Sequence, residues 1–252
     1  MIYKRFIPTL TLLLMTSALL AQDDIPDDHR LRVGVAAVSS NSIYLNGERQ
    51  NVVFPAFDYE YKNFYFQAGD AGYKILDQKI WQLDVGLSID FSGDVDRGDS
   101  PLFTHLPDLH YPLYSFVTFG ALTDYGLFDV RYDHEINNKH NGHIISANYT
   151  AYFKLKDWKF YPKLSQRRYS GEFVNYFYGV DTEFANDELP AYRGQKSDVT
   201  ELSLTILKNI TPQWYWVSSV RNQWFNDEIT NSPLVDDDQR LSLFIGVLYE
   251  IF

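Results

Sequence analysis

"WQLDVGLSIDFS", residues 81–92, alternates apolar and polar side chains without a break. The apolar face of an extended chain would carry Trp81, Leu83, Val85, Leu87, Ile89 and Phe91, and the polar face Gln82, Asp84, Gly86, Ser88, Asp90 and Ser92. A period of two residues is that of a β-strand with one apolar side and one wet side. The stretch therefore predicts a strand that separates an apolar medium from water.

The same alternation recurs along the chain, for example in residues 143–155 and 201–206. These predicted strands are about 10 to 14 residues long, whereas soluble sheets use strands of about 5 to 6 residues and a tilted membrane-crossing strand needs about 9 to 11. Strand length therefore favours a membrane protein. A soluble β-sandwich is the competing interpretation, and it predicts shorter strands.

The connections between the predicted strands alternate between short and long. Tight turns are expected at residues 62–63, 76–79, 124–126, 156–157 and 209–213, and long polar loops at residues 41–51, 92–111, 137–142, 170–196 and 226–238. Outer-membrane barrels combine short periplasmic turns with longer outside loops. The sequence therefore predicts an all-β fold, a transmembrane antiparallel up-and-down β-barrel.

The number of strands depends on residues 64–76. Ten other strands are expected near residues 31–40, 52–61, 80–91, 113–124, 126–136, 143–155, 158–169, 197–208, 214–225 and 239–252. Bacterial barrels normally have an even number of strands. Folding residues 64–76 as two short strands about Gly69 to Gly72 gives 12 and places every tight turn on the periplasmic side. We predict 12 strands, with 10 as the alternative if part of the N-terminal region folds into the lumen.

The N-terminal residues 1–21 have the charged start, apolar run and small final residue of a cleaved signal peptide. A retained membrane anchor is the alternative, but the apolar run is short for a span. Residues 22–252 would form one barrel domain in the outer membrane of a Gram-negative bacterium. The chain has no cysteine for a disulfide, and its net charge of -11 argues against a nucleic-acid partner.

Three groups of residues are candidate ion-binding sites. The 92–111 loop carries Asp94, Asp96, Asp99, His105, Asp108 and His110, and a second loop is flanked by His134, His140 and His143. The order of these residues fits no calcium-loop or zinc-site spacing, so solvated loop side chains are the preferred interpretation. The acidic run Asp236 to Asp238 is expected to be solvated or bridged to lipopolysaccharide. We predict no metal and no cofactor.

Enzymatic residues are also not expected. The sequence lacks a G-x-S-x-G elbow, and nothing pairs Ser165, Ser170 or Ser218 with a histidine and a carboxylate. An outer-membrane lipase or protease is the enzymatic alternative. The inward-facing charges are more informative, because Asp129, Arg131, Asp133 and Glu135 share one face of a strand, and Lys159, Lys163 and Arg167 lie on a second strand that we take to be its neighbour. We interpret this set first as a structural network of ion pairs in the lumen.

Several segments resemble the MipA/OmpV family of outer-membrane proteins. The resemblance rests on Tyr176, Phe177, Gly179 and Val180 in "YFYGV", on Leu189, Pro190, Ala191 and Tyr192 in "LPAY", on "LKNITPQW" before a Trp-bearing strand, and on Ser232 and Pro233 in "SPLV". The "VVFPAFDYEYKNFYFQAGDAGYKIL" segment is similar to the family's opening hairpin. The similarity spans most of residues 22–252.

Membership of this family would imply a non-enzymatic outer-membrane scaffold. Such a barrel would link a murein hydrolase, a lytic transglycosylase, to a murein synthase during peptidoglycan remodelling. Its other partners would be outer-membrane lipid and lipopolysaccharide. The alternative is a channel, or an uptake or adhesion barrel for small solutes or host surfaces.

The C-terminal "LSLFIGVLYEIF", residues 241–252, is expected to be the strand that closes the barrel. Leu241, Leu243 and Ile245 would face lipid, while Ser242 and Glu250 would face inward. Its final aromatic residues resemble the signal by which barrel-assembly machinery recognises its clients. We predict Tyr249 and Phe252 to be this signal.

Overall fold

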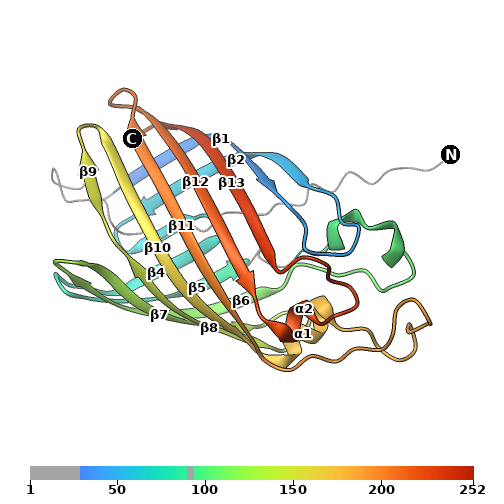
Figure 1. Cartoon of the computed structure of the whole chain (residues 1–252). Helices are drawn as coiled ribbons and strands as arrows, with labels where there is room; N and C mark the ends of the chain where they lie inside the picture. The colour runs from blue at the N-terminus through green and yellow to red at the C-terminus, as the bar shows by residue number, and fades with distance from the viewer. Residues whose placement is uncertain (1–28, 90–93) are drawn as a thin grey trace.

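The computed structural model of the chain describes residues 29–89 and 94–252. They form one closed antiparallel β-barrel (Figure 1). Its strands are β1 (His29–Ser40), β2 (Gln50–Tyr61), β3 (Phe64–Gln67), β4 (Asp70–Asp77), β5 (Trp81–Ile89), β6 (Leu113–Thr123), β7 (Gly126–Glu135), β8 (His143–Thr150), β9 (Phe153–Leu155), β10 (Trp158–Tyr169), β11 (Ser197–Asn209), β12 (Trp214–Phe225) and β13 (Gln239–Glu250). The predicted signal peptide, residues 1–21, lies outside the described residues.

The barrel wall has 12 strands, because β8 and β9 are two segments of one strand that both pair with β10. Pairing of β1 with β13, from Arg32 opposite Glu250 to Ser40 opposite Ser242, closes the wall. The prediction of 12 strands is confirmed.

Pro162 on β10 explains why β8 and β9 are separate. Thr150 pairs with Lys163 and Phe153 pairs with Phe160, so the register is the same on both sides of the break. The amide of Ala151 donates to the Pro162 carbonyl over 3.0 Å. Pro162 has no N–H to donate back, and the ladder is interrupted opposite it.

Residues 64–77 form two short strands, as predicted from the even number of strands in bacterial barrels. The turn between β3 and β4 uses Ala68 at φ 54° and Gly69 at φ 93°. β4 then pairs with β5 from Asp70 opposite Ser88 to Asp77 opposite Gln82, with a shift of register at Ile75. Because β3 has four residues and β4 has eight, this hairpin is shorter than the neighbouring strand β2.

The wall is apolar outside and polar or small inside over most of its circumference. On β13, Leu241, Leu243 and Ile245 are exposed, whereas Arg240 and Ser242 are buried. Three strands begin with an exposed tryptophan at the end that carries the tight turns, namely Trp81, Trp158 and Trp214. Tryptophan at this position is typical of the interfacial girdle of a membrane barrel.

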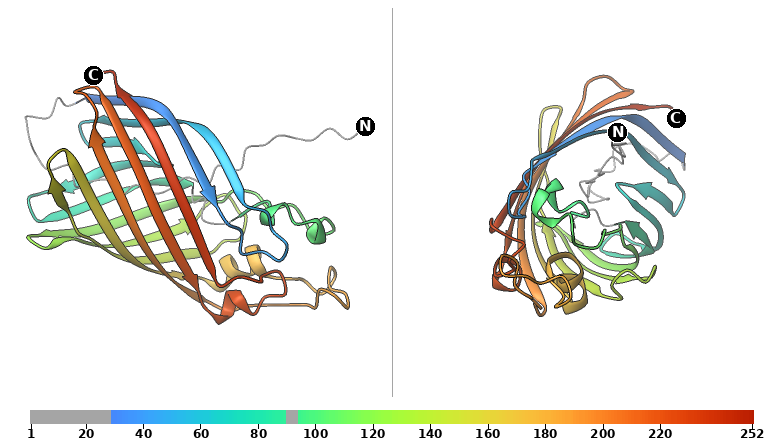
Figure 2. Two further views of the ribbon diagram at one scale, coloured as in Figure 1. Left: turned by 45° about the horizontal axis from the view of Figure 1, so that its top comes forward. Right: turned by 90° about the vertical axis from the view of Figure 1, so that its right-hand side faces the viewer.

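Except for the β3–β4 turn, which faces the long loops, the short turns lie at one end of the barrel and the long loops at the other (Figure 2). We call them the turn end and the loop end. The loop end carries the helices η1 (Arg97–Asp99), η2 (Pro101–Phe103), α1 (Gly171–Tyr178) and α2 (Asp227–Thr230). No helix in the described part of the chain has the length and hydropathy of a membrane-spanning helix.

Candidate functional site: loop cap, lumen and turn end

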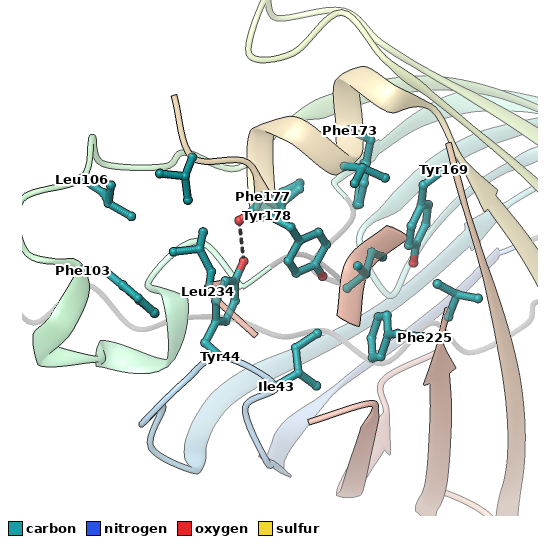
Figure 3. Packing of buried hydrophobic residues seen from close by; sticks show 14 of the residues in the cluster. Ile43, Tyr44, Phe103, Leu106, Tyr169, Phe173, Phe177, Tyr178, Phe225 and Leu234 are labelled. Carbon is teal, nitrogen blue, oxygen red and sulfur yellow. Dashed lines mark hydrogen bonds between the residues drawn. The ribbon is translucent and has the colours of Figure 1, made fainter. Parts of the chain in front are cut away.

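The largest apolar core of the protein lies at the loop end, where it joins the loops into one body that we call the loop cap (Figure 3). Its buried residues are Ile43, Tyr44, Phe103, Leu106, Tyr114, Ile144, Tyr169, Phe173, Val174, Phe177, Tyr178, Val180, Leu189, Val199, Phe225, Ile229 and Leu234. They come from both the long loops and the inner faces of the strands below. The loop cap therefore packs the long loops against one another and against the strands below them at the mouth of the barrel.

Helix α1 is the centre of the loop cap. Its N-cap is Ser170, whose hydroxyl accepts the amide of Phe173 over 3.3 Å, an arrangement that satisfies one of the free amides of a first helical turn. Phe173 stacks on Tyr169 with ring centroids 4.2 Å apart, and its ring is tilted against that of Phe177 at 4.7 Å. The aromatic face of α1 is thus buried against the wall at the top of β10.

Two hydroxyl groups fasten other loops to α1. The Tyr44 hydroxyl of the β1–β2 loop donates to the carbonyl of Phe177 over 3.0 Å (Figure 3). The Ser232 hydroxyl of the β12–β13 loop donates to the carbonyl of Tyr178 over 2.6 Å. Both carbonyls belong to the last turn of the helix, where intrahelical partners are missing. These bonds tie three loops together without exposing a backbone acceptor.

The YFYGV, LPAY and SPLV segments of the family resemblance lie in or beside this loop cap, whereas LKNITPQW and the opening-hairpin segment lie in the wall and at the turn end. Phe177, Val180 and Leu189 are in its core, and Tyr192 packs against it. Val180 and Tyr192 exchange two backbone hydrogen bonds of 2.9 Å each. Tyr176, Gly179 and Pro233 are partly buried, while Pro190 and Ala191 are exposed. Three separate sequence segments thus build one structural unit, and the predicted signature is a packing signature.

Glu135, the last residue of β7, organises the β7–β8 loop. Its carboxylate accepts the backbone amides of Asn137 at 2.5 Å, Lys139 at 3.0 Å, His140 at 3.0 Å and Asn141 at 2.6 Å. Charged acceptors of amide donors form some of the stronger hydrogen bonds in proteins. Glu135 was expected in the ion-pair network of the lumen, but its hydrogen-bond partners are backbone amides of the β7–β8 loop.

Both ring nitrogens of His140 lie within hydrogen-bond distance of other groups of the protein. Its Nδ1 accepts the amide of Gly142 over 2.9 Å, and its Nε2 lies 2.9 Å from the Tyr114 hydroxyl. Within residues 29–89 and 94–252 no group of three or more His, Asp or Glu side chains is arranged to hold a metal.

Asp94 holds the β5–β6 loop to the β1–β2 region. Its carboxylate accepts Gln50 Nε2 over 2.8 Å and the amide of Asp96 over 3.2 Å. Burial raises its pKa, and the Arg240 guanidinium opposes that rise. Arg97 of the same loop donates to the carbonyl of Pro107 over 2.9 Å, and burial lowers its pKa. These charges are structural ties within the loop cap.

The lumen below the loop cap is crossed by ion pairs. Arg131 on β7 lies 2.5 Å from Asp70 on β4 and 2.8 Å from Asp133 on its own strand. Its guanidinium also lies 4.0 Å from the centre of the Phe116 ring, and Ser88 donates to Asp70 over 2.6 Å. Two strands, β5 and β6, separate β4 from β7 along the wall, so this ion pair spans a chord of the barrel.

The expected pairing of neighbouring strands of opposite charge is wrong in one respect. β7 and β10 are separated by β8, whose Asn148 donates to Asp129 over 2.6 Å. A cavity of about 100 Å³ remains between these strands, and its lining includes Asp84, Asp129, Lys163 and Glu201. Charged side chains in the lumen were predicted, but which of them lie next to one another depends on the curvature of the closed wall.

One side of the lumen is apolar, and this was not predicted from the sequence. We call it the lumen apolar cluster: Ala36, Val38, Phe54, Val217 and Phe244, with Val52, Ala56, Leu207 and Leu248 packed against them. It faces inward from β1, β2, β11, β12 and β13. The signal is visible in "VGVAAV" and "LFIGVL", where apolar residues occupy both faces of the strand.

The turn end presents large apolar side chains that are exposed. Tyr125, at the tip of the β6–β7 turn, is 82% exposed, and Ile210, in the β11–β12 turn, is 52% exposed. The carbonyl of Tyr125 accepts the Tyr149 hydroxyl over 2.7 Å, so the turn is held while its ring projects outward. These residues are part of the exposed apolar surface of that end.

Comparison with known proteins gives one family. Residues 33–251 match the model of MltA-interacting protein MipA. The chain is 23% identical to MltA-interacting protein of Escherichia coli K12 over 78% of this chain and 80% of that protein, and 21% identical to outer membrane protein YiaT of Escherichia coli O157:H7 over 86% and 89%.

Two outer-membrane channels are among the solved structures that align with the chain. The outer membrane channel DcaP of Acinetobacter baumannii aligns with a TM-score of 0.39 and 8% identity over 88% of this chain and 97% of that chain. A TodX monoaromatic hydrocarbon channel mutant aligns with a TM-score of 0.41 and 8% identity over 90% of each chain.

Proposed function

The chain belongs to the MipA family of outer-membrane barrels, and from this premise we propose that it is a non-enzymatic scaffold that holds cell-wall enzymes at the outer membrane. Its partners would be a lytic transglycosylase and a murein synthase. A relative named for its interaction with such an enzyme supports this class of partner.

The observation that carries the proposal is the loop cap. Transport needs a path through both ends of the barrel, and the loop end is packed with side chains that are almost fully buried, such as Tyr44 at 1% and Phe177 at 1% exposure. The lumen is further crossed by the Arg131 ion pairs. The turn end, which faces the periplasm if the short turns are periplasmic, is the surface left for a partner.

Tyr125 and Ile210 are the residues of that surface best suited to a partner. Exposed aromatic and aliphatic side chains lose the most water-exposed apolar area on binding, and aromatic anchors dominate the energetics of many interfaces. The lumen cavity with Asp84 and Lys163 in its lining favours the alternative, a small-solute channel. That alternative requires the loop cap to open.

Capture of a purified lytic murein transglycosylase on the immobilised, detergent-solubilised barrel tests the proposal. We expect binding by the wild type and a loss of roughly tenfold for the Tyr125→Ser/Ile210→Ser variant, corresponding to about 1.4 kcal/mol. Leu102→Ser is the matched control, because Leu102 is 41% exposed but lies at the loop end. No capture by the wild type, or equal capture by the turn variant, would overturn the proposal.

A further inference from the structure

The lumen cavity is lined by more charged side chains than the ion pairs beside it use. Arg131 is committed to two carboxylates, those of Asp70 at 2.5 Å and Asp133 at 2.8 Å. Glu201 is committed to Arg221, whose Nε lies 3.3 Å from its carboxylate. These pairs neutralise one another and hold the strands across the lumen.

Three further charged side chains line the same cavity, namely Asp84, Asp129 and Lys163. All three are partly exposed to the lumen. In the described part of the chain, none of them forms an ion pair, although the Asp129 carboxylate accepts Asn148 Nδ2 over 2.6 Å. Two carboxylates and one ammonium group therefore face the cavity in addition to the pairs that span it.

The cavity separates its acids from its lysine. Gln82, Gly120 and Asp129 stand opposite one another on β5, β6 and β7, and Asp84 lies two residues from Gln82 on the same face of β5. Asp84 and Asp129 are close enough for their charges to repel each other. Lys163 is on β10, beyond β8. One side of the cavity is therefore acidic and the other side is cationic.

The acidic side has room for a group between its two carboxylates. Gly120 has no side chain, so the inner wall is low between β5 and β7, and the hydroxyl of Thr118 lines the cavity nearby. An ammonium group donates three hydrogen bonds, and Asp84, Asp129 and Thr118 offer it acceptors. The cavity of about 100 Å³ holds several water-sized groups. It therefore suits a small organic molecule better than a single ion.

The cavity extends toward the turn end of the barrel. Gln82 and Leu127 line it, and they are the second residues of β5 and β7, two strands that begin at the turn end. The loop cap lies at the opposite end. Under the rule that short turns are periplasmic, the way into the cavity from the turn end starts in the periplasm.

We propose that the lumen binds a small free amino acid from the periplasm, with its ammonium group between Asp84 and Asp129 and its carboxylate at Lys163. A zwitterion supplies both charges that the cavity calls for on one short molecule. A simple cation would leave Lys163 without a counter-charge, and a simple anion would leave the two acids without one. The site needs no path through the loop cap, and it does not depend on the scaffold role.

Saturation-transfer NMR titrations of the purified, detergent-solubilised barrel test this site, with L-alanine as the probe. N-acetyl-L-alanine lacks the ammonium group and L-alaninamide lacks the carboxylate, so each keeps only one half of the proposed contacts. Lys163→Met and Asp129→Asn remove one charge each with little change of volume. Lys159→Met is the matched control, because Lys159 lies on the same face of β10 but outside the cavity lining.

We expect saturable binding of L-alanine by the wild type and roughly tenfold weaker binding of both blocked derivatives, since each loses charge-assisted hydrogen bonds. Lys163→Met and Asp129→Asn should each weaken L-alanine binding by a similar factor, and Lys159→Met should leave it unchanged. No binding by the wild type, equal binding of the three compounds, or unchanged binding by either cavity variant would overturn the proposal.

Heat-modifiable migration on gels identifies the variants that fold. The comparison of the three compounds uses only the wild type, so it decides the proposal even when a variant does not fold. Capture of a transglycosylase at the turn end is a separate measurement, and failure of one proposal is therefore distinguished from failure of the other.

Discussion

Glu135→Gln should destabilise the loop cap, because one carboxylate accepts four backbone amides. Its side chain is 2% exposed, so water does not replace a lost partner in the folded state. If the glutamine oxygen takes the place of Oε2, it keeps the amides of Lys139, His140 and Asn141. The glutamine nitrogen then faces the amide of Asn137, which loses its acceptor.

The magnitude follows from these contacts. Leaving one buried amide without an acceptor costs about 2 kcal/mol, and replacing three charged hydrogen bonds with neutral ones costs about 1 kcal/mol each, which gives about 5 kcal/mol in total. Local opening of residues 136–142 returns the amides to water and sets an upper limit to the observed loss. We therefore expect the free energy of unfolding to fall by about 3 to 5 kcal/mol, or the loop amides to lose protection against hydrogen exchange.

Urea unfolding of the barrel in lipid vesicles, followed by tryptophan fluorescence, measures the global loss, and hydrogen exchange by mass spectrometry measures the local one. Asp198→Asn is the control, because this carboxylate also accepts two charged hydrogen bonds, from Arg168 at 2.7 and 2.8 Å, but on an exposed surface. Its effect should be much smaller. If Glu135→Gln leaves both unfolding and amide exchange unchanged, the role assigned to Glu135 is wrong.

Three other perturbations test separate parts of the structure. Burial raises the pKa of Asp94, so its stabilising contribution is complete below the ordinary carboxyl pKa and is lost as pH rises through the raised value. In urea titrations, Asp94→Asn should therefore match the stability of the wild type at pH 4 and exceed it at pH 8. Equal unfolding curves of the two proteins at both pH values would contradict this. Arg131→Met should cost about 3 kcal/mol by removing the cation between the carboxylates of Asp70 and Asp133, and adding Asp70→Asn should recover part of that loss in a double-mutant cycle. Additive losses would refute the coupling. Deleting Phe252, whose carbonyl accepts the amide of Leu31 over 2.9 Å, should lower the fraction of heat-modifiable barrel in the outer membrane, and unchanged insertion would show that Phe252 is not needed as an assembly signal.

The wall could be predicted because its determinants are local. Alternation in residues 81–89 and 143–150 needs only the period of a strand and an apolar surrounding. The hairpin observed at residues 64–77 was predicted because a single strand there would have given an odd number of strands. It would also have placed the tight turns on either side of it at opposite ends of the barrel. The interruption opposite Pro162 was not predicted, because residues 143–155 were expected to form one continuous strand; its cause is the missing N–H of Pro162.

The loop cap and the lumen could not be predicted in the same way. Tyr44, Phe177 and Ser232 are far apart in sequence, and their meeting depends on how five loops fold over one mouth. The ion pair between Asp70 and Arg131 requires the curvature of a closed barrel, which strand order alone does not specify. Residue type could identify these side chains as inward-facing, but their partners depend on three-dimensional closure.

The most direct test of a closed scaffold is single-channel recording of the purified, folded barrel in planar lipid bilayers, with a general porin as the positive control. The scaffold proposal requires the loop cap, with Tyr44, Phe173 and Phe177 in its core, to close the loop end, so the barrel should show no unitary conductance steps at neutral pH. Reproducible steps from the wild-type barrel would contradict the closed loop cap and favour the channel.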